Sequence, residues 1–300
     1  MPRERTHAAA DLSLLAITAV WGFTFPAVKR ALEAADPFSF LAARFALAAV
    51  VVAVVFRRRA LRANARTIGL SAFVGVWLTA GYALQTVGLV YTTASKSAFI
   101  TGLFVVLVPV LSLAVSRTRP GLTSIAAVAL ASAGIYLLAS PTRGAVNIGD
   151  VLTIGCALAF ALHIVVAERV APRLDAVQLA FWQIATTAAL CLVFSLVSPE
   201  RRLPFTAWTV TALLVTGVMA TAVAFVVQMW AQQRTSATHV AVIFAGEPLF
   251  AALFSWLVQG EVLSGLRMVG GALILGGILL SQLRPRARAV GHEELAGEMR

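Results

Sequence analysis

Residues 228–262 read QMWAQQRTSATHVAVIFAGEPLFAALFSWLVQGEV and place one carboxylate, Glu247, in the middle of a long apolar run. Twelve residues without formal charge run from Thr235 to Gly246, and thirteen run from Pro248 to Gly260. At about 1.5 Å rise per residue, this length predicts a helix that crosses a membrane with the carboxylate near its centre. A charge at that depth costs on the order of 3 kcal/mol unless it faces a bundle interior or a wet cavity. We therefore expect the other helices to surround a cavity at Glu247.

The composition extends this prediction to the whole chain. Hydrophobic residues make up 60% of the 300 residues and charged residues 12%, with a mean hydropathy of +0.88, which is typical of an integral membrane protein. The apolar runs leave no room for a soluble domain, and none alternates as a barrel strand does. The sequence predicts an all-α integral membrane protein with ten transmembrane helices, at residues 12–31, 37–56, 68–90, 95–116, 120–140, 150–170, 176–198, 205–232, 236–259 and 264–283.

The basic residues predict the orientation of these helices. Of the 24 Lys and Arg residues, 16 lie before the first helix, in the even-numbered loops or in the tail, and seven lie on the other side. Because cytoplasmic loops carry the excess of Lys and Arg, we expect cytoplasmic termini in a plasma (inner) membrane protein, with Arg58 and Arg288 inside and Arg143 and Arg202 outside. The net charge of +11 then indicates contact with the bilayer surface, and no nucleic acid is expected as a partner.

The two halves of the chain resemble each other. A shift of 139 residues aligns Asp11 with Asp150, and a shift of 143 residues aligns Gln85 with Gln228. We expect a first five-helix repeat at residues 1–140, a second at 141–283 and a cytoplasmic tail at 284–300. Because five is an odd number, the second repeat enters the membrane from the opposite side. Such inverted repeats are the architecture of alternating-access transporters.

Aromatic and polar side chains share one face on each of four helices, and they predict a substrate cavity. The pairs spaced by three are Trp21 with Thr24, Tyr82 with Gln85, Phe160 with His163, and Phe225 with Gln228. Phe99, Phe244 and Glu247 complete the predicted substrate-binding set. Hydrogen bonding between helices, at about 0.6 kcal/mol per contact, is the alternative for the polar members. As a cavity, the set suits an amphipathic small molecule with an apolar or aromatic body.

Other polar residues leave alternatives open. Arg44 lies about two turns into the second helix, close enough to the outer end to snorkel, where it forms a structural ion pair or contacts substrate. Lys29 and Lys96 lie near the outer face, where they anchor helices or attract an anionic group. Cys156 and Cys191 are expected to be free thiols in the core. The four histidines show no metal spacing, so we expect neither a metal nor another cofactor.

Proline and glycine positions predict where the helices bend or approach closely. Pro26, Pro109 and Pro248 each free a backbone carbonyl, which is tolerated beside a cavity or a hinge. The last helix carries Ala272 and Gly276 in small-xxx-small spacing, which favours close helix packing within the chain or across a dimer. A monomer and a homodimer are therefore both open.

Several motifs together resemble the EamA-type transporters of the drug/metabolite transporter superfamily. They are Trp21-Gly22-Phe23-Thr24-Phe25-Pro26 with Lys29, Asp36-Pro37 with Arg44, Tyr91-Thr92-Thr93-Ala94-Ser95, Glu247-Pro248, Gly260-Glu261 and Gly276-Gly277-Ile278. The resemblance covers residues 12–283 and implies two inverted five-helix halves, a central cavity and export of small metabolites; within the family, an aromatic amino acid exporter is the nearest expectation. One departure is that the first half has Arg117-Thr118-Arg119 where the second half has Glu261.

These observations predict a transporter that exports small amphipathic metabolites, best of all amino acids including aromatic ones, by alternating access. A facilitative multidrug or metabolite uniporter or a channel would share the polar stripes but would need no inverted hinge. A membrane-embedded enzyme is disfavoured, because the sequence contains no HExxH or GxSxG motif and no paired carboxylates at catalytic spacing.

Overall fold

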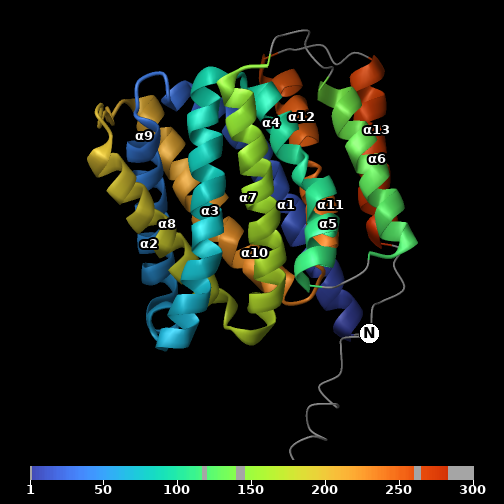
Figure 1. The fold of residues 1–300 in the computed structure, drawn as a ribbon, viewed down its shortest axis with the longest axis horizontal. Coiled ribbons are helices and arrows are strands. Elements are labelled where there is room, and N and C mark those ends of the chain that lie inside the picture. Colours follow the sequence, from blue (N-terminus) through green and yellow to red (C-terminus); the bar gives the residue numbers. More distant parts are fainter. Residues whose placement is uncertain (1, 117–119, 140–145, 260–264, 283–300) are drawn as a thin grey trace, which may run out of the picture.

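The computed structural model describes residues 2–116, 120–139, 146–259 and 265–282, and every regular element in these ranges is helical (Figure 1). The elements are α1 (Pro2–Ala31), α2 (Pro37–Leu61), α3 (Ala65–Tyr91), α4 (Ala94–Gly102), α5 (Phe104–Ser116), α6 (Leu122–Ala139), α7 (Ile148–Val170), η1 (Ala171–Arg173), α8 (Ala176–Val197), α9 (Ala207–Leu214), the π-helical η2 (Val215–Val223), α10 (Ala224–Gln232), α11 (Ala237–Phe244), α12 (Glu247–Gln259) and α13 (Gly265–Gln282).

These elements form the ten predicted crossings. Within the described ranges, nine helical segments are long and apolar enough to span a membrane, and the shorter apolar helix Leu122–Leu138 supplies the tenth. Large apolar side chains such as Val54, Leu122 and Val197 are exposed on the outside, as a lipid-facing surface requires. The chain is therefore a multi-pass membrane protein, as the sequence predicts.

Three crossings differ from the uninterrupted helices expected from the sequence. The fourth breaks at Leu103, between α4 and α5, and the ninth breaks at Ala245 and Gly246, directly before Glu247. The eighth continues from α9 to α10 through a π-helical stretch. The 143-residue shift of the sequence repeat carries Leu103 onto Gly246, so the two breaks occupy equivalent places in the two halves. Broken helices at equivalent places are a feature of inverted-repeat transporters.

The crossings form two central bundles between two outer pairs. We call α1, α9–η2–α10 and α11–α12 the α1 bundle, in which α1 contacts both other crossings. We call α3, α4–α5 and α7 the α7 bundle, in which α7 contacts both other crossings. The outer pairs are α2 with α8 and α6 with α13, which lie at opposite sides of the molecule (Figure 1). Below, the N-terminal face is the membrane face at which α1 begins.

Polar side chains at the helix starts explain where the helices begin. Asp36 accepts a hydrogen bond from the Ser39 amide at the start of α2, and Asp175 accepts bonds from the amides of Val177 and Gln178 at the start of α8. Such caps satisfy backbone donors that the helix itself leaves unpaired. Because the 139-residue shift relates Asp36 to Asp175, the repeat seen in the sequence appears here as two matching caps on opposite faces.

The outer pair of α6 and α13 explains the glycines of the last helix. A Cβ on Gly270 would lie 2.6 Å from the backbone nitrogen of Leu138, and one on Gly277 would lie 2.8 Å from the carbonyl oxygen of Ala127. The close approach of α13 to α6 thus depends on two glycines of α13 that lie about two turns apart. It does not use the Ala272 and Gly276 spacing, because nothing lies within 4 Å of a Cβ placed on Gly276. The positions 117–119, 143, 260–261 and 284–300 singled out in the sequence lie outside the described residues.

Candidate substrate cavity

A cavity lies between the two central bundles at the level of the helix breaks. It holds about 660 Å³ of space not filled by atoms, the open space at its mouth included. Its lining extends to Val28 and Leu89, near the last turns of α1 and α3, and so reaches toward the face opposite the N-terminal one. Ten of the eleven predicted residues line it: Trp21, Thr24, Tyr82, Gln85, Phe160, His163, Phe225, Gln228, Phe244 and Glu247.

Phe99 is the predicted residue that the cavity lining lacks. It is partly buried and packs against the main hydrophobic core, whereas Thr101 and Phe104 line the cavity from the same crossing. Residues two positions apart in an α-helix are separated by roughly 200° around its axis, so Phe99 and Thr101 cannot share a face. The break at Leu103 then turns Phe104 toward the cavity side.

Aromatic rings form a continuous wall across both bundles. Trp21 contacts Phe244 with ring centroids 4.9 Å apart and Phe225 at 5.9 Å. Phe225 in turn contacts Tyr82 at 6.2 Å, and Tyr82 contacts Phe160 at 5.2 Å. The indole nitrogen of Trp21 donates to the Ala220 carbonyl at 2.7 Å, which fixes the ring against η2. Edge-to-face contacts of this kind hold rings in place and leave an apolar surface for a ligand.

The polar lining residues also join helices, so both interpretations of the polar stripes hold for some of them. His163 Nε2 and Gln183 Oε1 lie 2.8 Å apart and join α7 to α8, and the Gln85 amide donates to Thr101 Oγ1 at 3.3 Å. The Gln228 amide nitrogen donates to Gln232 Oε1 at 3.0 Å, but its own Oε1 is buried without a partner among the described residues. Gln228 therefore keeps an acceptor for another group.

Arg44 lies inside the molecule and does not snorkel to the surface. Its side chain is 3% exposed, its Nε donates to Thr221 Oγ1 at 2.9 Å, and Nη2 donates to the Tyr82 hydroxyl at 3.3 Å. Its guanidinium carbon lies 4.6 Å from the centre of the Tyr82 ring. No carboxylate of the described residues lies within ion-pair distance of it, so the structural ion pair considered from the sequence is not formed there.

Glu247 is the first residue of α12 and lies directly after the helix break. Backbone N–H groups at a helix start favour a negative charge, which makes this place less costly for a carboxylate than the middle of a helix. Its carboxylate makes no hydrogen bond or ion pair within the part of the chain that the structure describes. The α1 bundle closes tightly behind it, because a Cβ on Gly22 would lie 2.8 Å from the Glu247 carbonyl oxygen.

The two lysines near the face opposite the N-terminal one are already engaged. Lys29 Nζ donates to the carbonyls of Leu89 at 2.5 Å and Val90 at 3.2 Å, and Lys96 pairs with Asp150 at 2.5 Å. They tie helices together, as anchoring predicts. Both cysteines are buried free thiols, and no cluster of His, Cys, Asp and Glu able to hold a metal ion occurs among the described residues.

The π-helical turn η2 is a feature beside the cavity that the sequence did not predict. Thr221 Oγ1 donates to the carbonyl of Thr216, five residues earlier, at 2.7 Å, while it accepts from Arg44. The same turn presents the Ala220 carbonyl to Trp21. Turns of this type occur often at functional sites. The threonines five residues apart are the only signal in the sequence that could have indicated it, and that signal is weak.

Comparison with known proteins agrees with this architecture. The model of the EamA-like transporter family matches twice, at residues 8–140 and 147–283. An uncharacterized transporter of Archaeoglobus fulgidus is 34% identical over 92% of this chain and 86% of its own length, and the uncharacterized transporter YoaV of Bacillus subtilis is 21% identical over 90% and 95%. A crystal structure with 19% identity shares the fold, with a TM-score of 0.75 over 92% of this chain and 98% of the other. The chain belongs to the EamA-like transporter family, and it is a transporter and not an enzyme.

Proposed function

We propose that this transporter exports small amphipathic metabolites, best of all amino acids with aromatic or apolar side chains, by rocking the α1 bundle against the α7 bundle around the cavity. The observation that carries this proposal is the unequal set of hydrogen bonds that joins the two bundles at the two membrane faces. A carrier needs two such closures, one on each side of its substrate, and it must open them in turn.

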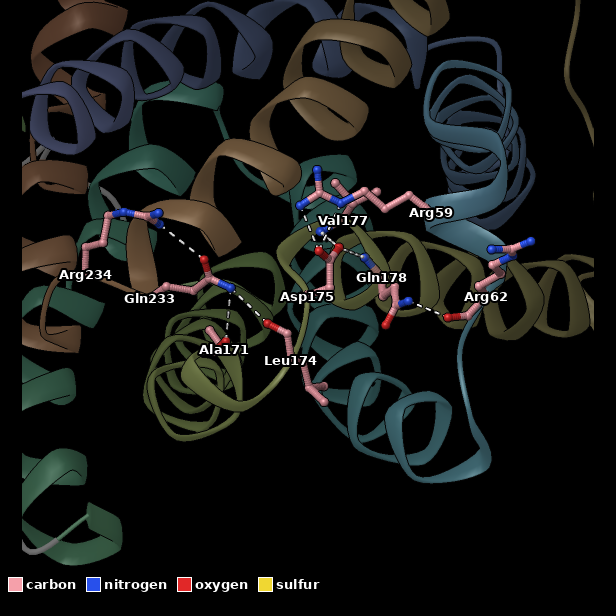
Figure 2. Close-up of polar contacts among 9 residues, drawn as sticks. All are labelled: Arg59, Arg62, Ala171, Leu174, Asp175, Val177, Gln178, Gln233 and Arg234. Carbon is pink, nitrogen blue, oxygen red and sulfur yellow. Dashed lines mark hydrogen bonds and ion pairs between the residues drawn. The ribbon is translucent and has the colours of Figure 1, made fainter. Parts of the chain in front are cut away.

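Several contacts close the N-terminal face. Gln232, at the end of α10, donates to the Ile164 carbonyl at 2.9 Å. Gln233, which follows α10, donates to the carbonyls of Ala171 at 3.3 Å and Leu174 at 2.9 Å (Figure 2). The amide of Ala237, at the start of α11, donates to Glu168 Oε1 on α7 at 2.8 Å. We call these contacts of Gln232, Gln233 and Glu168 the N-face closure.

At the opposite face, the hydrogen bonds between the same two bundles come from Lys29 alone among the described residues. The 139-residue shift relates Lys29 to Glu168, and the 143-residue shift relates its acceptors Leu89 and Val90 to Gln232 and Gln233. The two closures thus lie at equivalent positions of the two repeats but are made by different residue types. The stronger one lies on the N-terminal face, and the cavity extends toward the weaker one.

Other polar contacts stay within a bundle and support its motion as a unit. His239 and Asp11 meet at 2.9 Å between α11 and α1, and Lys96 meets Asp150 between α4 and α7. These pairs are also related by the two shifts, since Asp11 corresponds to Asp150 and Lys96 to His239. A bundle held together in this way can tilt without losing its internal hydrogen bonds.

The cavity lining supports the proposed cargo. Trp21, Phe225 and Phe244 offer an apolar wall, while Gln228 and Glu247 offer acceptors for a polar head group. An amino acid with an aromatic side chain matches both parts. Inorganic phosphate has no apolar surface and would leave the aromatic wall without a partner.

Counterflow in reconstituted vesicles tests the proposal. Vesicles preloaded with unlabelled phenylalanine, leucine, glucose or phosphate are diluted into the labelled solute, and uptake is followed against unloaded vesicles. We expect preloading to accelerate uptake of phenylalanine, and of leucine to a smaller extent, with no effect for glucose or phosphate. Uptake that preloading leaves unchanged would indicate a pore, and movement of glucose or phosphate alone would reject the cargo.

Export also requires an orientation. We propose that the N-terminal face, which carries Arg58 and Arg59, is cytoplasmic and that Arg202 is external in the plasma membrane, because basic residues accumulate on cytoplasmic loops. Single cysteines at Arg58 and Arg202 in a cysteine-free background test this with an impermeant maleimide on whole cells. Labelling at position 202 and protection at position 58 are expected, and the reverse pattern would overturn the orientation.

A further inference from the structure

We propose that Arg44 is the anion-binding residue of the cavity and that it receives the carboxylate of the transported molecule. This inference rests on the proposed function and narrows it, since it requires the cargo to be an organic acid with an apolar body and assigns one residue to recognise it.

The surroundings of Arg44 leave part of its binding capacity unused. A guanidinium carries five N–H donors and stays charged at every physiological pH. Two of these donors have partners, Thr221 and the Tyr82 hydroxyl, and both partners are neutral. The side chain is more than nine-tenths buried and belongs to the cavity lining. The remaining donors are therefore available to a ligand in the cavity.

A cation buried in this way calls for an anion. Buried charges in proteins are paired as a rule, because hydrogen bonds to neutral groups satisfy the donors without neutralising the charge. The described residues supply no carboxylate to Arg44, and Glu247, which lines the same cavity, is not within ion-pair distance of it. A carboxylate that arrives with the substrate would complete the pair in the bidentate geometry that a guanidinium favours.

The neighbouring groups fix the direction of the guanidinium. Thr221 gives its own proton to Thr216 and so can only accept from Arg44, while the Tyr82 ring lies beside the guanidinium. The π-helical turn of η2 is what brings Thr221 to this place. Arg44 is thus held from two elements, one in each central bundle, with its guanidinium carbon 4.6 Å from the centre of the Tyr82 ring of the aromatic wall.

Matched acids and amides test the proposal on the wild-type protein. Binding of phenylalanine is compared with that of phenylalaninamide, and binding of 3-phenylpropionate with that of 3-phenylpropionamide, by calorimetry or thermal shift in detergent. The acid of each pair should bind at least about tenfold more tightly than its amide, as loss of a charge-assisted hydrogen bond implies. Two pairs are needed because only the first carries an amine that could respond to Glu247.

Variants test whether Arg44 causes the preference for the acid over the amide. Arg44→Gln should abolish the preference for the acid in both pairs while the amides still bind, and Arg44→Lys should retain part of it. Arg30→Gln is the matched control, because Arg30 lies 4.3 Å from the Trp208 ring at the surface, away from the cavity, and should retain the whole preference.

Three outcomes would overturn the inference, and they differ in what else they reject. Equal binding of acid and amide by the wild type would remove Arg44 from substrate recognition and leave the proposed transport of amphipathic solutes intact. Failure of all four probes to bind, together with absent phenylalanine counterflow, would reject the proposed cargo and the inference with it. Equal loss of acid and amide binding in folded Arg44→Gln would make the residue structural.

Discussion

Gln233 offers a direct perturbation of the N-face closure. Its side-chain nitrogen donates to Ala171 and Leu174, and the substitution Gln233→Ala removes both bonds (Figure 2). A neutral hydrogen bond contributes about 0.5–1.5 kcal/mol net, so two bonds that share one nitrogen contribute about 1–2 kcal/mol. That energy changes the ratio of closed to open N-terminal faces by about 5- to 30-fold. We expect the cavity to become correspondingly more accessible from that face.

The assay is the maleimide labelling rate of a cysteine in the cavity. Thr24→Cys supplies the reporter, because Thr24 lines the cavity, and Cys156 and Cys191 are replaced beforehand. The reagent is added at the N-terminal face of oriented vesicles. Gln178→Ala is the matched control, since the Gln178 amide also donates to a backbone carbonyl at this face, that of Arg62, but within the outer pair of α2 and α8 (Figure 2).

Labelling should rise by about 5- to 30-fold in Gln233→Ala and should stay at the parental rate in Gln178→Ala. A rate unchanged in both variants would refute the assignment of Gln233 to a closure. An equal rise in both would mean that the face loosens generally, and the two-bundle account would then lose its support.

Three further outcomes follow from the structure. Partial burial raises the pKa of Asp175, but the hydrogen bonds from Arg59 and from the helix-cap amides lower it more, so the folded-state pKa lies below the usual value. The ion pair of Asp175 with Arg59 therefore stabilises the fold modestly above about pH 4. This stabilisation is lost as the pH falls through the folded-state pKa. The melting-temperature gap between wild type and Asp175→Asn should shrink on acidification, and a constant gap would contradict this. Gly270→Val should destabilise the protein by about 1–3 kcal/mol in thermal or denaturant unfolding, whereas Gly276→Val should not; equal effects would refute the α6–α13 packing. Glu247→Gln should melt like the wild type, because the carboxylate has no partner among the described residues, but should change phenylalanine counterflow; a strong loss of stability would reveal a structural role.

The number of crossings and most of the cavity could be predicted from the sequence. Apolar runs of spanning length show where helices cross, and the i, i+3 pairs show which face turns inward, because both are local properties of a helix. The repeat then related Trp21 with Thr24 to Phe160 with His163, and all four line one cavity. Phe99 does not line the cavity, because it lies roughly 200° around α4 from Thr101, which does.

Features that depend on distant partners could not be predicted. Arg44 meets Thr221 across 177 residues, so the sequence left a structural ion pair and a substrate contact equally open. Gln233 lies in a polar segment that resembles any interfacial loop, and its acceptors are backbone carbonyls, which no side-chain pattern can indicate. The π-helical turn packs against α1 and α2, and contacts between distant helices leave no periodic signal in the sequence.

The central claim is that the two faces open in turn, and the distance between spin labels on the two bundles tests it most directly. One pair, at Glu33 and Tyr91, spans the face opposite the N-terminal one, and the other, at Arg173 and Thr235, spans the N-terminal face. In Gln233→Ala relative to wild type, the account predicts a longer distance for Arg173 and Thr235 and a shorter one for Glu33 and Tyr91. A longer distance at the N-terminal face with the opposite face unchanged or also longer would contradict alternating access.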